Sequence, residues 1–394
     1  MSHALDGVRV LDFSQMMMGP WCTQLLGDLG ADVIKVERPG TGDWERGLPA
    51  AGQLVKGESP FFLAMNRNKR SVSLDLKHRR AREVVDRLAK RSDLVVENYR
   101  PGVMDRLGFG YEEMRRVNPR IVYVSGSGYG SQGPYVDRPG QDLLIQALSG
   151  LAAYGGRASD PPTPSGTSIA DSSSALMMAF SAVVGLYHAH RSGEGQRIEV
   201  DLFSTATAIQ CQEWSAYLNL DKPVVRSRAG IAAAWNSAPY GIYRTADGYL
   251  ALAMASLRVL GEILELPELA GFDELETAYD ARDQVKEIIE TRLATQPTRY
   301  WLDVLLAHDV WVAEVKDFDK LVDDPQLRHN KLLDEFEHPT AGVVRVVGMP
   351  MRMGVTPGEI RLPAPLLGQH TDEVLEELGY SRDDIRVLHE EGAV

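Results

Sequence analysis

The sequence has only two cysteines, Cys22 and Cys211, among its 394 residues. Two isolated thiols exclude a disulfide framework, and the missing Cys-x-x-Cys pair removes the usual thiolate zinc site. We find no His, Asp or Glu spacing that would hold a metal instead. A reducing compartment suits such a chain, so we expect a cytoplasmic protein without a metal ion.

A leader peptide and a long apolar segment are missing as well. The start, MSHALDGVRV, runs directly into a strand-like pattern, which predicts no signal peptide. The longest apolar run, ALMMAFSAVVGLY, has about 13 residues, whereas a bilayer needs about 20. We therefore interpret it as a buried helix and expect no contact with a membrane.

An excess of positive charge is also absent. The 42 Lys and Arg residues face 55 Asp and Glu residues, which leaves a net charge of −13. This balance argues against a nucleic-acid binder. An anionic ligand would need basic residues that are gathered locally, against the field of the whole chain.

The first third of the chain alternates strand-like and helical patterns. Apolar, β-branched strand patterns occur at residues 8–14, 32–40, 71–76, 93–99 and 120–128. The alternation predicts an α/β fold with a Rossmann-like, doubly wound parallel sheet, which binds ligands at the carboxyl ends of its strands. The first turn reads SQMMMGP and lacks the G-x-G-x-x-G fingerprint, so a nicotinamide or flavin dehydrogenase is disfavoured.

The length of the chain suits two domains. We expect a large Rossmann-like domain over residues 1–224 and a smaller α+β domain over residues 225–325, which starts near a hairpin around Ala246-Asp247-Gly248. Residues 326–394 form an extended, Pro-rich return segment with a helix near its end, and are expected to complete the large domain.

One acid stands alone in the stretch SGTSIADSSSALMMAF, residues 165–180. Asp171 precedes an apolar helical pattern, and an Asp at such a place is typical of a helix N-cap. The same place suits a carboxylate nucleophile, because the positive end of the helix dipole would keep it ionised. Periodicity alone favours the cap, so other residues must decide between a helix cap and a nucleophile.

Several segments resemble the family III CoA transferases, the group of formyl-CoA transferase and carnitine CoA-transferase. They are LDGVRVLDFSQMMMGPWCTQLLGDLGADVIKVERPGTGD, NKRSVSLDLK, VVENYRPGVMDRLGFGY, the segment around Asp171, GEGQRIEVDLF, YRTADGYLAL and PLLGQHTDEVLEELG. The resemblance spans nearly the whole chain. It implies an enzyme that moves CoA from an acyl-CoA to a free carboxylic acid. It also implies an interlocked homodimer, with CoA as a substrate and no tightly bound cofactor.

The resemblance also assigns roles to residues. Asp171 matches the family Asp that attacks the acyl-CoA thioester. The residues that match CoA-binding positions are Met17, Arg38, Leu74, Lys77, Asn98, Tyr99, Arg100, Arg106 and Arg138. A single Arg would be read as a solvated charge, but several at strand ends suit the phosphates of CoA. Lys69 and Arg70 are weaker candidates.

Gln141 separates two related activities. The α-methylacyl-CoA racemases resemble this sequence too, but there a His occupies the position of Gln141 and exchanges the α-proton. Gln cannot titrate, so CoA transfer is favoured over racemisation. Asp142 either orients neighbouring groups or ligand, or caps the helix that begins LLIQAL.

The sequence defines less well the part of the site that binds the acceptor carboxylic acid. Trp235 and Asn236, in AAAWNSAPYG, lie where the family places its acceptor-side loop. They either shape the acyl pocket or pack within the loop. The glycine run of oxalate-type enzymes is missing, so the sequence does not identify the acid. Succinate, oxalate and a branched hydroxyacid are all compatible, and a non-catalytic acyl-CoA-binding protein remains an alternative.

Overall fold

The computed structural model describes residues 2–394 and divides the chain into two compact units. The first unit comprises Met1–Ile145, Ser168–Ala206 and Pro325–Val394, and the second comprises Gln146–Thr167 and Thr207–Asp324. Residues 146–167 and 207–224, which we expected in the large domain, thus lie in the second unit. The return segment lies in the first.

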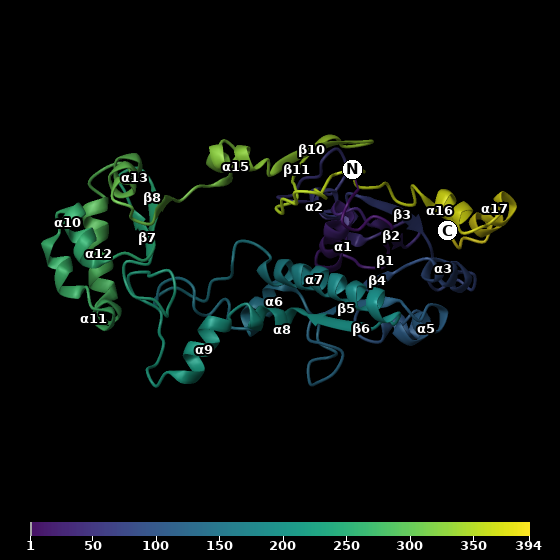
Figure 1. Ribbon diagram of the computed structural model, residues 1–394, viewed down its shortest axis with the longest axis horizontal. Helices are drawn as coiled ribbons and strands as arrows, with labels where there is room; N and C mark the ends of the chain where they lie inside the picture. Colours follow the sequence, from purple (N-terminus) through teal and green to yellow (C-terminus); the bar gives the residue numbers. More distant parts are fainter. Residues whose placement is uncertain (1) are drawn as a thin grey trace. The chain divides into compact units, whose positions relative to one another are not determined.

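A six-stranded parallel sheet forms the centre of the first unit (Figure 1). Its strands are β1 (Arg9–Asp12), β2 (Asp32–Glu37), β3 (Lys69–Ser73), β4 (Leu94–Glu97), β5 (Val122–Ser127) and β6 (Arg197–Asp201). Their order is β3-β2-β1-β4-β5-β6, and every neighbouring pair is parallel. This confirms the predicted doubly wound sheet. Its direction of winding reverses between β1 and β4, where such sheets bind ligands.

Helices cover the sheet on both faces. On one face α1 (Met18–Asp28) packs against α7 (Ile169–Ser192), which also contacts β5 and β6. A Cβ at Gly185 of α7 would come within 2.6 Å of Val122, so this glycine permits the helix to lie directly on β5. The helices that share a separate buried core with the strands are α3 (Ala81–Lys90), α5 (Tyr111–Val117), α16 (Thr371–Glu377) and α17 (Arg382–Glu390).

The connections of the first unit hold shorter elements. They are η1 (Trp44–Gly47), α2 (Pro60–Met65), α4 (Val103–Leu107) and α15 (Pro325–Asn330), while α6 (Asp142–Leu148) and α8 (Leu202–Ala208) each run from the first unit into the second. The return segment forms an antiparallel hairpin, β10 (Leu333–His338) and β11 (Gly342–Val347), where we expected only extended chain. α17 was not predicted either.

The second unit has its own sheet and core. Its antiparallel strands are β7 (Gly241–Arg244), β8 (Tyr249–Leu252) and β9 (Val312–Glu314). Its helices are α9 (Cys211–Asn219), α10 (Leu257–Leu264), η2 (Pro267–Phe272), α11 (Leu275–Asp280), α12 (Arg282–Leu293), α13 (Thr298–Ala307) and α14 (Phe318–Leu321). Tyr243, Leu250 and Trp301 are buried in one apolar core. The unit therefore has a core of its own.

The strands β1, β2 and β3 carry buried charged side chains that pair with one another and with the loop after β2. The Asp12 carboxylate is fully buried and accepts hydrogen bonds from Thr23 Oγ1 at 2.6 Å and from Lys69 Nζ at 3.1 Å. Lys35 Nζ, also fully buried, donates to Asp43 Oδ2 at 3.0 Å. Burial opposes ionisation of Asp12, but Lys69 and Lys35 hold the pKa of this carboxyl below its usual value. Lys69 is therefore engaged inside the protein and is not a phosphate contact.

Replacing Asp12 should destabilise the fold strongly. Asp12→Ala leaves Lys69 buried without its carboxylate, and we expect a loss of about 3–5 kcal/mol in the free energy of unfolding. Urea unfolding followed by circular dichroism measures the loss, and adding Lys69→Met should recover part of it. Glu390→Ala, which breaks the exposed pair with Arg386, should cost less than about 1 kcal/mol. Equal losses in the two single variants would contradict this account.

Candidate active site

The loops after β1 and β4 are joined at the point where the sheet reverses. Gln15 N donates to Asn98 Oδ1 at 2.7 Å, and Asn98 Nδ2 donates to the carbonyl oxygen of Gln15 at 2.7 Å. The Gln15 side chain also donates to Tyr99 Oη at 2.7 Å. These reciprocal bonds hold together two loops that carry predicted CoA contacts, Met17 on one and Asn98 and Tyr99 on the other.

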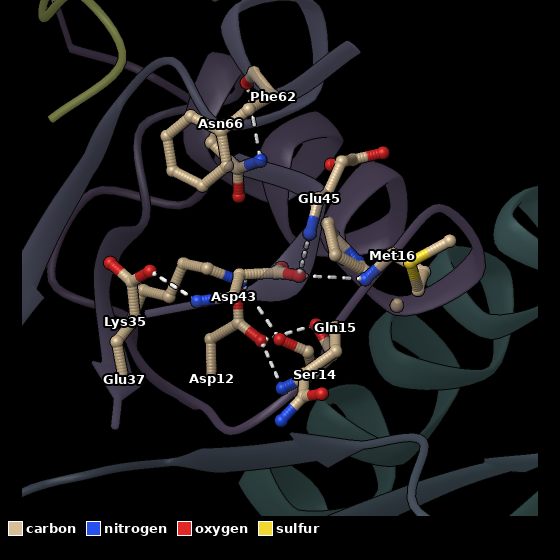
Figure 2. A network of polar contacts seen from close by, with 12 residues as sticks. Asp12, Ser14, Gln15, Met16, Lys35, Glu37, Asp43, Glu45, Phe62 and Asn66 are labelled. Atoms are coloured by element: carbon tan, nitrogen blue, oxygen red, sulfur yellow. Dashed lines mark hydrogen bonds and ion pairs between the residues drawn. The ribbon is translucent and has the colours of Figure 1, made fainter. Parts of the chain in front are cut away.

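The loop after β1 has an unusual backbone that Asp43 supports. Met16 has φ of 64°, the left-handed region that a residue with a Cβ rarely adopts. Asp43 Oδ1 accepts the N–H of Met16 at 3.2 Å and that of Glu45 at 3.0 Å, while Oδ2 binds Lys35 (Figure 2). One buried carboxylate therefore connects the loops after β1 and β2.

Asp171 lies in the first turn of α7 but does not cap the helix. The N-cap residue is Ser168, which makes no side-chain capping bond. Instead, Asp142 Oδ1 accepts the N–H of Ala170 at 2.8 Å and that of Asp171 at 3.1 Å. Asp142 thus takes the role that periodicity favoured for Asp171, and it orients a neighbouring helix as one of our two interpretations proposed.

The electrostatic setting of Asp171 differs from our expectation. Burial, followed by the negative charge of Asp142, raises the pKa of Asp171 to about 7. We expected the helix dipole to favour the ionised form of this carboxylate, and burial and the charge of Asp142 act in the opposite direction. Two of the N–H groups that form the positive end of the α7 dipole already donate to Asp142, so these two do not bind the Asp171 carboxylate. A carboxyl with a pKa near 7 is typical of functional sites.

The predicted CoA contacts all lie in the first unit, in the segments that follow the carboxyl ends of the strands. Met17 follows β1, Arg38 follows β2, Leu74 and Lys77 follow β3, and Asn98, Tyr99, Arg100 and Arg106 follow β4. Arg38, Arg100 and Arg106 are exposed and form no ion pair within residues 2–394. Arg70, in contrast, pairs with Asp32, Glu373 and Glu377, so it is occupied in the fold. Exposed, unpaired guanidinium groups in so acidic a chain are available to phosphates.

The segment between β5 and α6 carries two more predicted residues. The Arg138 guanidinium stacks on the Tyr135 ring, 3.7 Å from its centroid. Gln141 is exposed, and its side-chain oxygen accepts the N–H of Leu143 at 3.1 Å. A Cβ at Gly128 would come within 2.6 Å of the Gly140 backbone, so two glycines allow the ends of this loop to close. The closure brings Gln141 and Asp142 back to the end of β5.

Trp235 and Asn236 belong to the second unit. The Trp235 ring packs against Tyr154 with centroids 5.3 Å apart, and the Asn236 N–H donates to Ala233 O at 3.1 Å. Trp235 also lines a cavity of about 310 Å³ together with Tyr154, Trp214 and Tyr217. Trp235 is thus both a packed loop residue and a wall of a hollow.

Removing the charge of Asp142 should lower the pKa of Asp171. Asp142→Asn keeps an oxygen that can accept the α7 N–H groups but removes the repulsion that raises this pKa. Titration of protein with ¹³C-labelled aspartate, followed by NMR and assigned through Asp171→Asn, measures the change. An unchanged or higher pKa in Asp142→Asn would contradict the role given to Asp142.

Known proteins resemble the chain over almost all of its length. Residues 5–371 match the family described as CoA-transferase family III. Succinyl-CoA:glutarate CoA-transferase of Mus musculus is 34% identical, over 99% of this chain and 88% of that protein. Formyl-CoA:oxalate CoA-transferase of Rhodopseudomonas palustris (strain BisA53) is 32% identical, over 100% of this chain and 98% of that protein.

Solved structures agree with this relationship. The crystal structure of a CAIB/BAIF family protein from Brucella suis has a TM-score of 0.82 and 29% identity, and the match covers 96% of this chain and all of that one. The crystal structure of Rv3272 from Mycobacterium tuberculosis has a TM-score of 0.81 and 29% identity, and the match covers 94% of this chain and 99% of that one. The resemblance inferred from sequence is confirmed: the chain belongs to CoA-transferase family III, whose enzymes transfer CoA between an acyl-CoA and a carboxylate.

Proposed function

We propose that Asp171 is the nucleophile of a CoA transfer between an acyl-CoA and a small carboxylic acid. The observation that carries the proposal is the arrangement at the start of α7. Asp142 binds the helix N–H groups, so the Asp171 carboxylate is not used as a cap. Its pKa of about 7 leaves a substantial ionised fraction at neutral pH, and burial leaves that fraction poorly solvated and reactive.

The reaction has four balanced steps. An Asp171 oxygen attacks the thioester carbon, the C–S bond breaks, and CoA leaves as thiolate from a mixed anhydride. The thiolate attacks the aspartyl carbonyl, which releases the first carboxylate and forms an aspartyl-CoA thioester. The acceptor carboxylate displaces the thiolate to form a second anhydride. The thiolate then attacks the acceptor acyl carbon and regenerates Asp171.

The chain must hold CoA during this exchange, because the thiolate leaves and returns. Arg38 and Arg106 suit the phosphates, since both are exposed and unpaired at the carboxyl edge within the described residues 2–394. Holding the thiolate close makes its return effectively intramolecular. The N–H groups of Ala170 and Asp171 are occupied by Asp142, so the oxyanions must be stabilised by other donors than these two.

The acceptor is proposed to be a small mono- or dicarboxylate. Relatives whose names include glutarate and oxalate support dicarboxylates as the first acids to test. A panel of acyl-CoA donors crossed with succinate, glutarate, oxalate and branched hydroxyacids, read by thioester exchange, identifies the pair. Solvent deuterium entering a 2-methylacyl-CoA without an acceptor would support racemisation instead.

Replacing Asp171 should abolish transfer and leave CoA binding intact. For Asp171→Asn and Asp171→Ala we expect losses of at least about a thousandfold in kcat, because no nucleophile remains. Hydroxylamine trapping with mass spectrometry should modify the Asp171 peptide of the wild type only. Asp383→Asn, on the exposed surface of α17, is the matched control and should behave as wild type. Full transfer in either Asp171 variant would overturn the mechanism, and tight CoA binding without any adduct in the wild type would favour a binding protein.

We also propose that two copies of the chain associate through α7. One face of this helix is buried against α1 and the sheet. The other face exposes a continuous apolar stripe, with Leu176 51%, Phe180 66%, Val183 42% and Tyr187 62% exposed. Within residues 2–394, α7 is the one helix long and apolar enough to cross a bilayer. Because its other face is packed into the fold, a second protein surface suits the stripe better than lipid.

A charge in this stripe should prevent association. Phe180→Asp is expected to convert a dimer into monomer or aggregate, because the dimer would have to bury an unpaired carboxylate. Light scattering after size-exclusion chromatography measures the mass. Val355→Asp, at a residue that is 84% exposed outside α7, is the control and should remain dimeric. A monomeric wild type would contradict the proposal, as would binding of the wild type to phosphatidylcholine vesicles that Phe180→Asp abolishes.

A further inference from the structure

Glu97 ends β4 and lies buried at the start of the loop that carries Asn98, Tyr99 and Arg100. The residue is 7% exposed, and its Oε2 accepts the backbone N–H of Tyr99 at 2.9 Å. The next residue, Asn98, exchanges two hydrogen bonds with Gln15 in the loop after β1. The start of this loop is therefore held at two points, by a carboxyl group and by an amide.

A small cavity borders the same loop. It has a volume of about 30 Å³, and its walls include Glu97, the loop residues 99–102 and Ser125 of β5. Ser125 lies opposite Glu97 in the parallel pair of β4 and β5, and its Oγ is buried without a hydrogen-bond partner among residues 2–394. A polar cavity of this volume has room for a water molecule, and a buried hydroxyl without a protein partner is the kind of group that such a water serves.

The charge of Glu97 is not fixed by an ion pair within the described part of the chain. The other ionisable groups on the cavity wall, apart from Tyr99, are Arg100, Asp105, Tyr111, Tyr123, Arg197 and Glu199. Arg197 pairs with Glu199 at 2.8 Å and not with Glu97. Burial raises the pKa of Glu97 to about 7, although the nearby Ser125 hydroxyl and the Tyr99 N–H oppose the rise. This carboxyl group can therefore gain or lose a proton near neutral pH.

The loop continues into the residue that we propose as a phosphate ligand. Gly102, with φ of 78°, is the N-cap of α4. A Cβ at Gly102 would come within 3.2 Å of Arg106 Nη1, so the Arg106 side chain lies back against the end of the loop. Order at Tyr99 is thus passed along a short stretch of chain to the guanidinium group of Arg106.

We propose that Glu97 is a positioning residue for CoA binding. As a carboxylate it holds the Tyr99 N–H, and with it residues 98–102, in the conformation that receives CoA, and it shares a water molecule with Ser125 in the cavity. The inference rests on the proposed binding of CoA to this loop. A hydrogen bond to a carboxylate is about twice as strong as one to a neutral group, so the ionised form orders the loop more firmly and lowers the entropy cost of binding.

The pH dependence of CoA affinity tests the inference. Phosphate groups and Asp171 also titrate near neutral pH, so the quantity to compare is the Kd of Glu97→Gln divided by the Kd of wild type at each pH. Calorimetric titration with CoA measures both values. Glu97→Gln keeps an oxygen that accepts the Tyr99 N–H but cannot ionise. We expect a ratio near 1 at pH 5.5, where the wild-type carboxyl is neutral too, and about fivefold at pH 8.5.

Removing the acceptor should weaken CoA binding more than it slows the chemistry. Glu97→Ala leaves the Tyr99 N–H unpaired, so we expect Kd to rise about tenfold while kcat at saturating acyl-CoA stays within about threefold. Hydrogen–deuterium exchange should also be faster in the peptide of residues 98–104.

Two variants serve as controls. Val95→Ala, a buried truncation in the same strand, should lower the thermal midpoint but keep the wild-type Kd and the wild-type exchange of residues 98–104. Glu112→Gln, an exposed carboxyl on α5, should bind CoA like wild type at every pH.

The outcomes are separable. A ratio that stays constant or falls between pH 5.5 and 8.5 would overturn the role of Glu97. So would a Glu97→Ala protein that loses thermal stability as Val95→Ala does but keeps the wild-type Kd and exchange, because Glu97 would then be a structural residue only. If the ratio rises as expected but the wild type transfers CoA to no acid, the proposed function fails while the role of Glu97 stands. A wild type that binds no CoA would contradict both.

Discussion

The candidate site depends on carboxylates that are buried at the carboxyl edge of the sheet. Asp12 holds Lys69 and Thr23, and Asp43 holds Lys35 together with the N–H groups of Met16 and Glu45. Each bond is formed where water cannot compete, so removing one partner leaves the other buried and unsatisfied. The loop between β1 and α1 keeps its left-handed turn at Met16 because Asp43 Oδ1 accepts the N–H of Met16. The predicted CoA contacts lie on loops that these bonds support.

The charges of neighbouring carboxyl groups then affect the pKa values at this edge of the sheet. Asp142 binds the start of α7 and, together with burial, raises the pKa of Asp171 to about 7. Burial likewise raises the pKa of Glu45, and the charges of Asp43 and Asp171 add to the rise. Burial thus weakens the acidity of the carboxyl group that we propose as the nucleophile.

Much of the fold and of the site could be predicted from sequence. The apolar, β-branched runs predicted the parallel strands because such sheets are buried on both faces. Asp171, Arg38, Asn98 and Arg106 were assigned through the resemblance to the family, and the structure places the last three after the ends of β2 and β4. The hairpin of β10 and β11 was missed because its strands have no strong alternation of apolar residues, with Asp334, Glu335 and Glu337 in the first strand. Glu97 was missed because a Glu at the end of a strand has no local signal of burial.

The sequence by itself determined the alternation of strands and helices in the first third of the chain, the absence of a dinucleotide fingerprint and the resemblance to the family. These properties depend on periodicity and short motifs, which are local in the chain. Only the tertiary structure decided which acid caps α7, that Lys69 and Arg70 are occupied in ion pairs, and that Asp171 has a raised pKa. The reason is that burial and charge coupling join residues far apart in sequence, such as Asp142 with Asp171 and Asp12 with Lys69. The free energy of a buried charge depends on those neighbours and not on the residue alone.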